Sequence, residues 1–323
     1  MNIKKFSLLI LFVLTVGLLS ACSTPKEDPE QVVSKFKAAM TEVQSGDLTV
    51  DLAMQGADAQ DNLDFKGKVD LKFDRENEKE RKADINLLLS GSMKTAERSL
   101  SGNADLNFRT LGNQFYLQLK KLQADDPSMQ TIQPIVKYYE GKWLKLPEDL
   151  IPENVKQLQE KDEATLAKEE EYKKIFRESS LFSVTKEYGV ESVNGEKAYH
   201  YGITWSEAGV RDYLQKSAVL NGQPMQETNL NDALKLLATV SNTEFWVGTE
   251  DYYLYKGILT LNPANDAGVK TQVELTLNAN SYNEGANIET PKDATDFNPM
   301  ELLQFGQMGA AANEAPAPSA PKE

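Results

Sequence analysis

The sequence has very little of the two residues that most often carry metal and thiol chemistry. Its 323 residues include one cysteine, Cys22, and one histidine, His200. A single cysteine excludes a disulfide framework and a cysteine-rich zinc site. A single histidine excludes the HExxH motif and any histidine-rich metal centre. We therefore predict neither a metal nor a cofactor.

Catalytic motifs are equally scarce. A Ser–His–acid triad needs only one histidine, but the G-x-S-x-G nucleophile elbow, the Gly-rich phosphate loop and the dinucleotide fingerprint are absent. His200 lies in a segment, residues 197–203, that alternates like a strand, so we interpret it as an ordinary strand side chain rather than a base. We predict no catalytic residue and expect that the protein is not an enzyme.

Acidic residues outnumber basic ones by 49 to 35, a formal charge of −14. With so many carboxylates, any one pair is weak support for a site. Asp58, Asp61 and Asp64 cluster but lack the spacing and the glycine of a calcium-binding EF-hand loop. Residues 265–268 (Asn-Asp-Ala-Gly) are typical of a hairpin turn. The net charge repels phosphates, so we expect no nucleic-acid partner.

The N-terminus carries a targeting segment. Lys4 and Lys5 precede an apolar run, residues 6–18, that is too short to span a bilayer and typical of a secretory signal. The run ends in Leu-Ser-Ala-Cys, residues 19–22, which resembles the bacterial lipobox. That resemblance implies cleavage after residue 21 and a diacylglyceryl group on Cys22; an ordinary signal peptide followed by a free thiol is the alternative. Two acyl chains hold a protein stably on a membrane, at about 0.8 kcal/mol per buried methylene.

We therefore expect an extracytoplasmic protein anchored to a bacterial membrane. Residue 23 is Ser rather than Asp. In a bacterium with two membranes, serine at this position resembles the default pattern of lipoproteins held in the outer membrane. In a bacterium with one membrane, the anchor would hold the protein on the outer face of the cell membrane. Residues 22–30 form the lipidated tether.

Hydrophobic periodicity predicts a helix followed by long strands. Asp28 as N-cap with Pro29 at the first position opens a helix that Gly46 ends. Residues 63–74 then alternate strictly between apolar and charged side chains, which indicates an antiparallel strand with one wet face. The same alternation returns in residues 100–108, 115–119 and 273–277. Long alternating strands with short turns predict a large, curved antiparallel sheet.

Helices are expected between the two strand-rich parts. Residues 151–177 are dense in charge, with possible i,i+4 pairs Glu169–Lys173 and Glu170–Lys174. Ser206 can cap a helix that stops at Asn221, and a further helix is expected over residues 228–240. We predict one domain over residues 31–305 and a disordered Ala/Pro-rich tail over residues 306–323.

Several strand phrases occur in an order that resembles the LolA/LppX-like lipoprotein superfamily. They are GNQFYL at 112–117, YEGKWLKL at 139–146, NGEKAYHY at 194–201, EFWVGTEDY at 244–252, and Tyr282-Asn283 with Ile288-Glu289-Thr290-Pro291. The resemblance implies an α+β fold, in which about eleven antiparallel strands form an unclosed half-barrel with helices across its concave face. It also implies a space between sheet and helices that holds the acyl chains of a lipid, glycolipid or lipoprotein. No functional residue of the family maps onto a motif here.

An apolar concave face covered loosely by helices could bury alkyl groups. The candidate pocket lining is Phe36, Leu63, Phe65, Val69, Leu71, Leu106, Phe108, Leu214, Leu234 and Leu237. The alternative is that these side chains pack as a filled core. We therefore carry two hypotheses: a lipid-anchored protein that binds or transfers an amphiphile, and a structural or sensory envelope lipoprotein that acts as a protein-interaction module.

Overall fold

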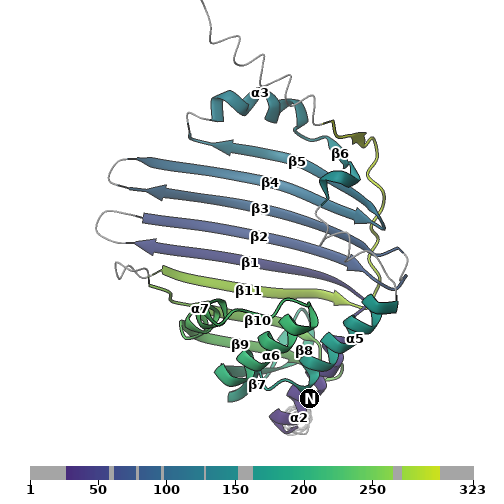
Figure 1. The fold of residues 1–323 in the computed structure, drawn as a ribbon. Coiled ribbons are helices and arrows are strands. Elements are labelled where there is room, and N and C mark those ends of the chain that lie inside the picture. The colour runs from purple at the N-terminus through teal and green to yellow at the C-terminus, as the bar shows by residue number, and fades with distance from the viewer. Residues whose placement is uncertain are drawn as a thin grey trace, which may run out of the picture.

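The computed structural model describes residues 27–57, 62–77, 80–95, 98–126, 129–151, 163–264 and 271–298. The signal peptide with Cys22, the acidic residues Asp58 and Asp61, the turn predicted at residues 265–268 and the tail from residue 306 lie outside these ranges. The described residues form one large sheet with helices beside it (Figure 1).

The sheet has twelve strands in the described residues, in the order β12-β6-β5-β4-β3-β2-β1-β11-β10-β9-β8-β7. Neighbouring strands are antiparallel, apart from the parallel pair of β12 and β6. Their bounds are β1 Ser45–Ala57, β2 Asn62–Asp74, β3 Lys82–Lys94, β4 Ser99–Leu111, β5 Gln114–Ala124, β6 Trp143–Leu146, β7 Phe182–Val193, β8 Glu196–Trp205, β9 Val240–Gly248, β10 Leu254–Leu261, β11 Thr271–Tyr282 and β12 Thr295–Asp296. The sheet is not closed, which confirms the predicted α+β half-barrel with a strand count close to eleven.

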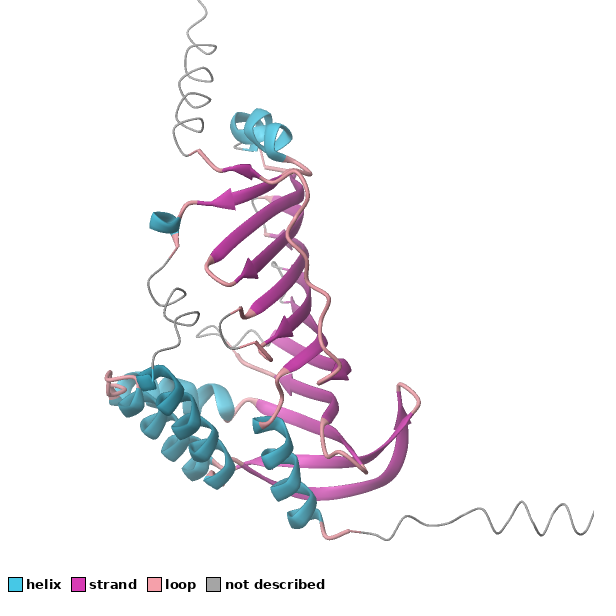
Figure 2. Cartoon of the chain, turned by 90° about the vertical axis from the view of Figure 1, so that its right-hand side faces the viewer, coloured by secondary structure: helices cyan, strands magenta, loops and turns pink. Residues whose placement is uncertain are grey.

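The described helices are α2 Pro29–Thr41, α3 Met129–Tyr139, α5 Glu163–Glu178, α6 Glu207–Leu220 and α7 Glu227–Leu237, with a short 3-10 turn, η1, at Glu148–Leu150. Figure 2 shows most of them gathered on one side of the sheet, at the end formed by β7–β10. α3 instead packs on β5 at the opposite end. None of the helices in the described ranges is long and apolar enough to cross a membrane.

Local sequence signals explain where two of the helices begin. The Asp28 carboxylate accepts a hydrogen bond from the backbone N–H of Glu30 at 2.8 Å, and Pro29 occupies the first turn of α2. The Ser206 hydroxyl accepts from the backbone N–H of Gly209 at 3.1 Å and caps α6. Both predicted caps are confirmed, because a side-chain oxygen there satisfies an N–H group that has no partner within the helix.

The charge-dense helix is shorter than predicted and pairs differently. η1 and α5 occupy parts of the predicted stretch, and residues 152–162 lie outside the described ranges. Lys173 pairs with Glu170 at 2.7 Å, an i,i+3 pair, rather than with Glu169. Glu169 instead binds Arg81, at the start of β3, with both carboxylate oxygens at 2.5 and 2.7 Å. The i,i+4 pairing was wrong because a distant arginine competes for the carboxylate.

The packed core lies at the end of the sheet that the helices cover. Val32 and Phe36 of α2 are buried against β7 and β8, together with Leu181, Phe182, Tyr199, Tyr201, Ile203 and Val247. The ring of Phe36 lies 6.2 Å from that of Phe182 and 6.1 Å from that of Phe245, between ring centroids. By contrast, none of the described apolar side chains of β1–β4 is fully buried. We call this end of the sheet the packed end. A second, smaller group of buried side chains lies at the other end, where α3 packs on β5, so the less buried strands β1–β4 lie between the two.

Candidate functional site

The long strands place their apolar side chains in rows that cross the sheet. One row contains Leu48, Leu71, Ile85 and Phe108, which are register partners on β1–β4, and a second contains Val50, Val69, Leu87 and Leu106. A third contains Leu52, Gly67, Leu89 and Ala104. The rows continue onto β11 through Leu275, Leu277 and Ala279, and onto β5 through Leu117, Leu119 and Leu122. We call the surface formed by these rows the apolar face.

The apolar face is on the same side of the sheet as the helices. The register carries the second row from Val50 to Leu277 on β11, Gly257 on β10, Phe245 on β9 and Tyr201 on β8. Phe245 and Tyr201 belong to the cluster that packs against α2. One row therefore begins in the packed core, under the helices, and continues across the open strands.

Beyond β11 the apolar face is only partly removed from solvent. Its side chains on β1–β3 are half-buried, and Phe108 on β4 is 37% exposed. The main contacts of the described helices are with one another, of α2 with β7 and of α3 with β5, and none of these helices has more than a weak contact with β1–β4. Because large apolar surface left in water marks a binding surface, this region is the candidate site.

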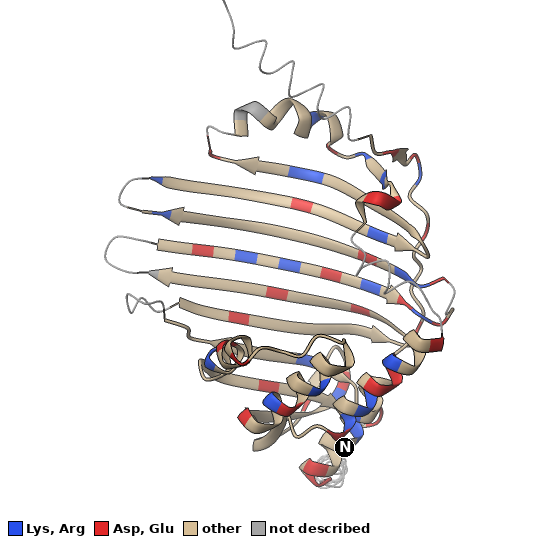
Figure 3. Cartoon of the chain, viewed as in Figure 1, with Lys and Arg blue, Asp and Glu red and all other residues tan. Residues whose placement is uncertain are grey.

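The side chains on the opposite face of the same strands are mostly polar, and many of them pair with one another. Figure 3 shows acidic and basic residues interspersed along β2. Lys68 lies 3.3 Å from Asp70, whose carboxylate also accepts from the Thr49 hydroxyl at 2.9 Å. Arg109 donates to Asp84 at 2.5 Å. Pairs between neighbouring strands cover much of this face, and the segment after β11 adds a contact, because Arg109 also donates to the backbone oxygen of Glu289 at 2.7 Å.

A hollow of about 510 Å³ lies on the polar face, not on the apolar one. Its charged and amide lining comes from Asp51, Lys66, Lys68, Asn103, Asp105, Lys121 and Glu274. All of these side chains alternate with the apolar rows, so they point to the other side of the sheet. This hollow suits a polar group and does not correspond to the predicted apolar pocket.

The ten candidate lining residues fall into separate places. The six strand residues lie on one side of the sheet: Val69, Leu71, Leu106 and Phe108 belong to the rows of the apolar face, and Leu63 and Phe65 extend that face toward the start of β2. Phe36 packs in the core with Phe182 and Phe245, and Leu214 is half-buried on α6. Leu234 and Leu237 of α7 line a different hollow, of about 320 Å³, beside β8 and β9. The strand residues therefore form one surface, whereas the helix residues do not converge on it.

The sequence interpretation missed two strands in the middle of the apolar face. β1 contributes Leu48, Val50 and Leu52, and β3 contributes Ile85 and Leu87. Each set alternates with polar residues for at least part of its strand, so period-two spacing was the signal that could have revealed it.

His200 lies on the side of the sheet away from the helices and is held by two carboxylates. Its Nδ1 lies 2.9 Å from Glu191 Oε1 and its Nε2 lies 2.9 Å from Glu244 Oε2. The imidazole stacks between the rings of Trp246 and Tyr188, with centroids 4.0 and 4.2 Å away. A hydrogen bond from the Trp246 indole, followed by one from His200, lowers the pKa of Glu191. This arrangement ties β7, β8 and β9 together.

Metal chemistry finds no support in the part of the chain that the structure describes. No group of three or more His, Cys, Asp or Glu side chains there is arranged to hold a metal ion. Within the same residues, the candidate site is formed by apolar side chains.

Comparison with known proteins finds distant neighbours among solved structures. No protein-family model and no curated protein sequence matches the chain. Among solved structures, it is similar to the lipoprotein LppX of Mycobacterium tuberculosis, at 12% identity and a TM-score of 0.32, over 81% of this chain and 100% of that one. A DUF1329 family protein from Desulfovibrio piger matches at 11% identity and a TM-score of 0.21, over 81% of this chain and 96% of that one.

A putative outer membrane lipoprotein-sorting protein domain from Vibrio parahaemolyticus matches at 10% identity and a TM-score of 0.21, over 80% of this chain and 93% of that one. At such identities the likeness concerns the fold alone.

Proposed function

We propose that this protein is a membrane-anchored extracytoplasmic lipoprotein that binds the alkyl chains of an amphiphile on its apolar face, without catalysing a reaction. The observation that carries the proposal is the partial exposure of the apolar rows on β1–β5, on the side of the sheet where the helices lie. Four of the six strand residues named from the sequence are in these rows, and the other two, Leu63 and Phe65, lie on the same side of β2.

The dimensions of the rows suit an acyl chain. From β11 to β5 a row crosses six strands, which at about 4.8 Å per step gives a length of about 24 Å. One leaflet of a bilayer has a hydrocarbon thickness of about 15 Å, half of the usual 30 Å. A whole acyl chain therefore fits along a row.

The free energy gained by burying an acyl chain on the apolar face is also large enough to hold the chain there. Burying a methylene contributes about 0.8 kcal/mol, so a chain of about twelve methylenes that buries half of its surface gains about 5 kcal/mol. The uncovered side chains of the face would lose water at the same time. Two chains of one lipid on neighbouring rows would double the gain.

A second function is favoured by the polar face. Its self-paired charges and its hollow of about 510 Å³ offer a surface for a polar group of an envelope partner. On this hypothesis the protein acts as an interaction module, and the apolar face serves only to hold the sheet together.

Native mass spectrometry followed by organic extraction separates the two functions. The chain from residue 23 onward, which includes every described residue, is purified from bacterial cells without detergent. We expect a stoichiometric lipid in the native spectrum and in the extract. A mass equal to the bare chain, unchanged after incubation with membrane lipids, would contradict amphiphile binding and favour the interaction module.

A further inference from the structure

The first described residue of the chain is fixed to the packed end of the sheet. The Glu27 carboxylate forms an ion pair with Lys35 of α2 and accepts from the Tyr252 hydroxyl at 2.9 Å. Lys35 Nζ also lies 3.0 Å from the same hydroxyl, so the three side chains form a closed cluster. Tyr252 is in the turn between β9 and β10. The chain therefore enters the domain at a defined point beside α2.

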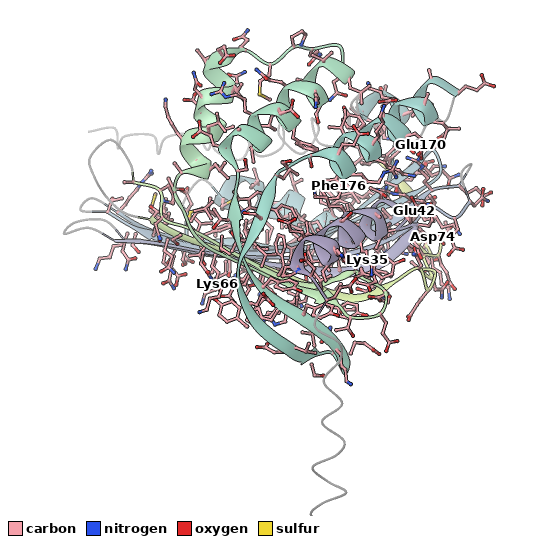
Figure 4. The ribbon with its side chains drawn as sticks, turned by 90° about the horizontal axis from the view of Figure 1, so that it is seen from below. Lys35, Glu42, Lys66, Asp74, Glu170 and Phe176 are labelled. Carbon is pink, nitrogen blue, oxygen red and sulfur yellow. The ribbon has the colours of Figure 1, made fainter. Side chains whose placement is uncertain are left out.

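The tether between that point and the predicted lipid is short. Cys22 and Glu27 are five residues apart in the sequence, and five extended residues span at most about 18 Å. Figure 4 views the molecule from this end and shows α2, with Lys35 and Glu42 labelled, beside the β7–β8 hairpin. A lipid on Cys22 would hold these elements close to the bilayer.

We infer that the end of the domain formed by α2 and β7 faces the anchoring bilayer, so that the sheet stands upright and its open apolar face is held away from that bilayer. The inference rests on the lipid anchor of the proposed function. It adds an orientation that neither the fold nor the anchor specifies alone.

The strand order gives the distances, along the sheet, of β1 and β5 from β7 at the packed end. β1 is five steps from β7 in the sheet and β5 is nine steps from it. At about 4.8 Å per step these strands lie about 24 and 43 Å from β7, measured along the sheet. The apolar rows run in the same direction as these steps. In this orientation an alkyl chain bound on β1–β5 would lie beyond the packed end, on the side away from the anchoring bilayer.

The helices argue against the opposite arrangement, in which the apolar face lies flat on lipid. α5, α6 and α7 project from the sheet on the same side as the apolar face (Figure 2). In Figure 4, Phe176 and Glu170 of α5 lie on one side of the sheet and Lys66 lies on the other. A planar bilayer would meet the charged helices, such as α5 with Glu170 and Lys174, before it reached the strands.

Site-specific fluorescence on the lipidated full chain tests the orientation. Because acylation consumes Cys22, single thiols can be introduced and labelled as Ser192→Cys on β7, Gln123→Cys on β5 and Phe108→Cys on the apolar face. Each variant is bound to phosphatidylcholine vesicles whose headgroups carry a quencher. We expect loss of most of the fluorescence at residue 192 and no loss at residues 123 and 108.

Each of the other outcomes overturns the inference in a recognisable way. Strong quenching at residue 108 would show the apolar face lying on lipid, and equal quenching at all three positions would show no fixed orientation. Failure of the intact chain to bind vesicles would remove the anchor itself. Lipid extraction from the chain that starts at residue 23 does not depend on orientation, so it tests amphiphile binding separately.

Discussion

Asn107 and Phe108, consecutive residues on β4, have exposures opposite to their polarity: Asn107 is 8% exposed and Phe108 is 37% exposed. Their side chains point to opposite faces of the sheet because side chains alternate along a strand. On the polar face, long neighbouring side chains such as Lys120, which donates to Asn86 at 2.6 Å, cover the short ones. On the apolar face, no described helix has more than a weak contact with β4. The reversal is what a surface built for a hydrophobic ligand would show.

The first prediction compares two exposed apolar side chains on opposite faces. Leu88, on the polar face, is 36% exposed, so Leu88→Ser is a matched control for Phe108→Ser. We expect Phe108→Ser to weaken binding of a fluorescent fatty acid at least several-fold, because it removes a contact on the apolar face, while Leu88→Ser leaves binding unchanged. Titration of the probe measures both. Equal effects of the two substitutions would exclude the apolar face as the binding surface.

The second prediction decides between a pocket and a core at Phe36. Phe36 is 5% exposed and contacts the rings of Phe182 and Phe245. Phe36→Ala should lower the free energy of unfolding by about 3–5 kcal/mol, as for other buried aromatic residues. Denaturant unfolding measures the loss, with the exposed Ser34→Ala on the same helix as control. A loss of ligand affinity without a loss of stability would instead place Phe36 in a ligand pocket.

The third prediction concerns the pH dependence that Glu191 contributes. The Trp246 indole N–H, 2.9 Å away, is the first cause of its lowered pKa, and His200 is the second. A carboxyl whose folded pKa is depressed stabilises the fold above its unfolded pKa, about 4.3, and the contribution disappears as the pH falls through the folded pKa. Glu191→Gln should therefore be less stable than the parent protein at pH 7, and the difference should shrink below about pH 4.

Urea unfolding of both proteins at several pH values measures this difference. The exposed Glu284→Gln is a control with the same change of charge. A stability difference for Glu191→Gln that is constant from pH 7 to pH 3 would show that the Glu191 contacts do not depend on its ionisation.

The fourth prediction uses a close approach in α6. A Cβ atom on Gly209 would lie 1.9 Å from the backbone oxygen of Ser180. Gly209→Ala should therefore destabilise the protein by about 1–3 kcal/mol through overpacking, although alanine is the better helix former. The neighbouring Ala208 is exposed, so Ala208→Gly should cost no more than about 1 kcal/mol. A stabilised Gly209→Ala in thermal unfolding would contradict the close packing of α6 on the segment before β7.

Some features followed directly from local sequence. Asp28 and Pro29 start α2 and Ser206 starts α6, because a cap needs only the residues around it. Strict alternation in residues 63–74 identified the apolar side of β2, because the pleat of a strand has a period of two. The alternation also identified six residues that share one face.

Other features depended on residues far apart in the chain. Glu169 pairs with Arg81 and not with Lys173, because folding brings the start of β3 beside α5. β1 pairs with β11, more than 200 residues later, and this pairing joins the open strands to the packed end. Hydrophobic periodicity cannot report such partners, because it depends only on near neighbours in sequence.

By itself, the sequence determined which side of each alternating strand is apolar and where the capped helices begin. It also determined that cysteine and histidine, the residues that most often carry thiol and metal chemistry, are scarce. Only the tertiary structure decided how much of the apolar face is covered. The described helices gather over β7–β10, and none of them has more than a weak contact with β1–β4. Periodicity is a property of one strand, whereas coverage depends on where separate elements pack, so the same alternating pattern is compatible with a filled core and with an open binding face.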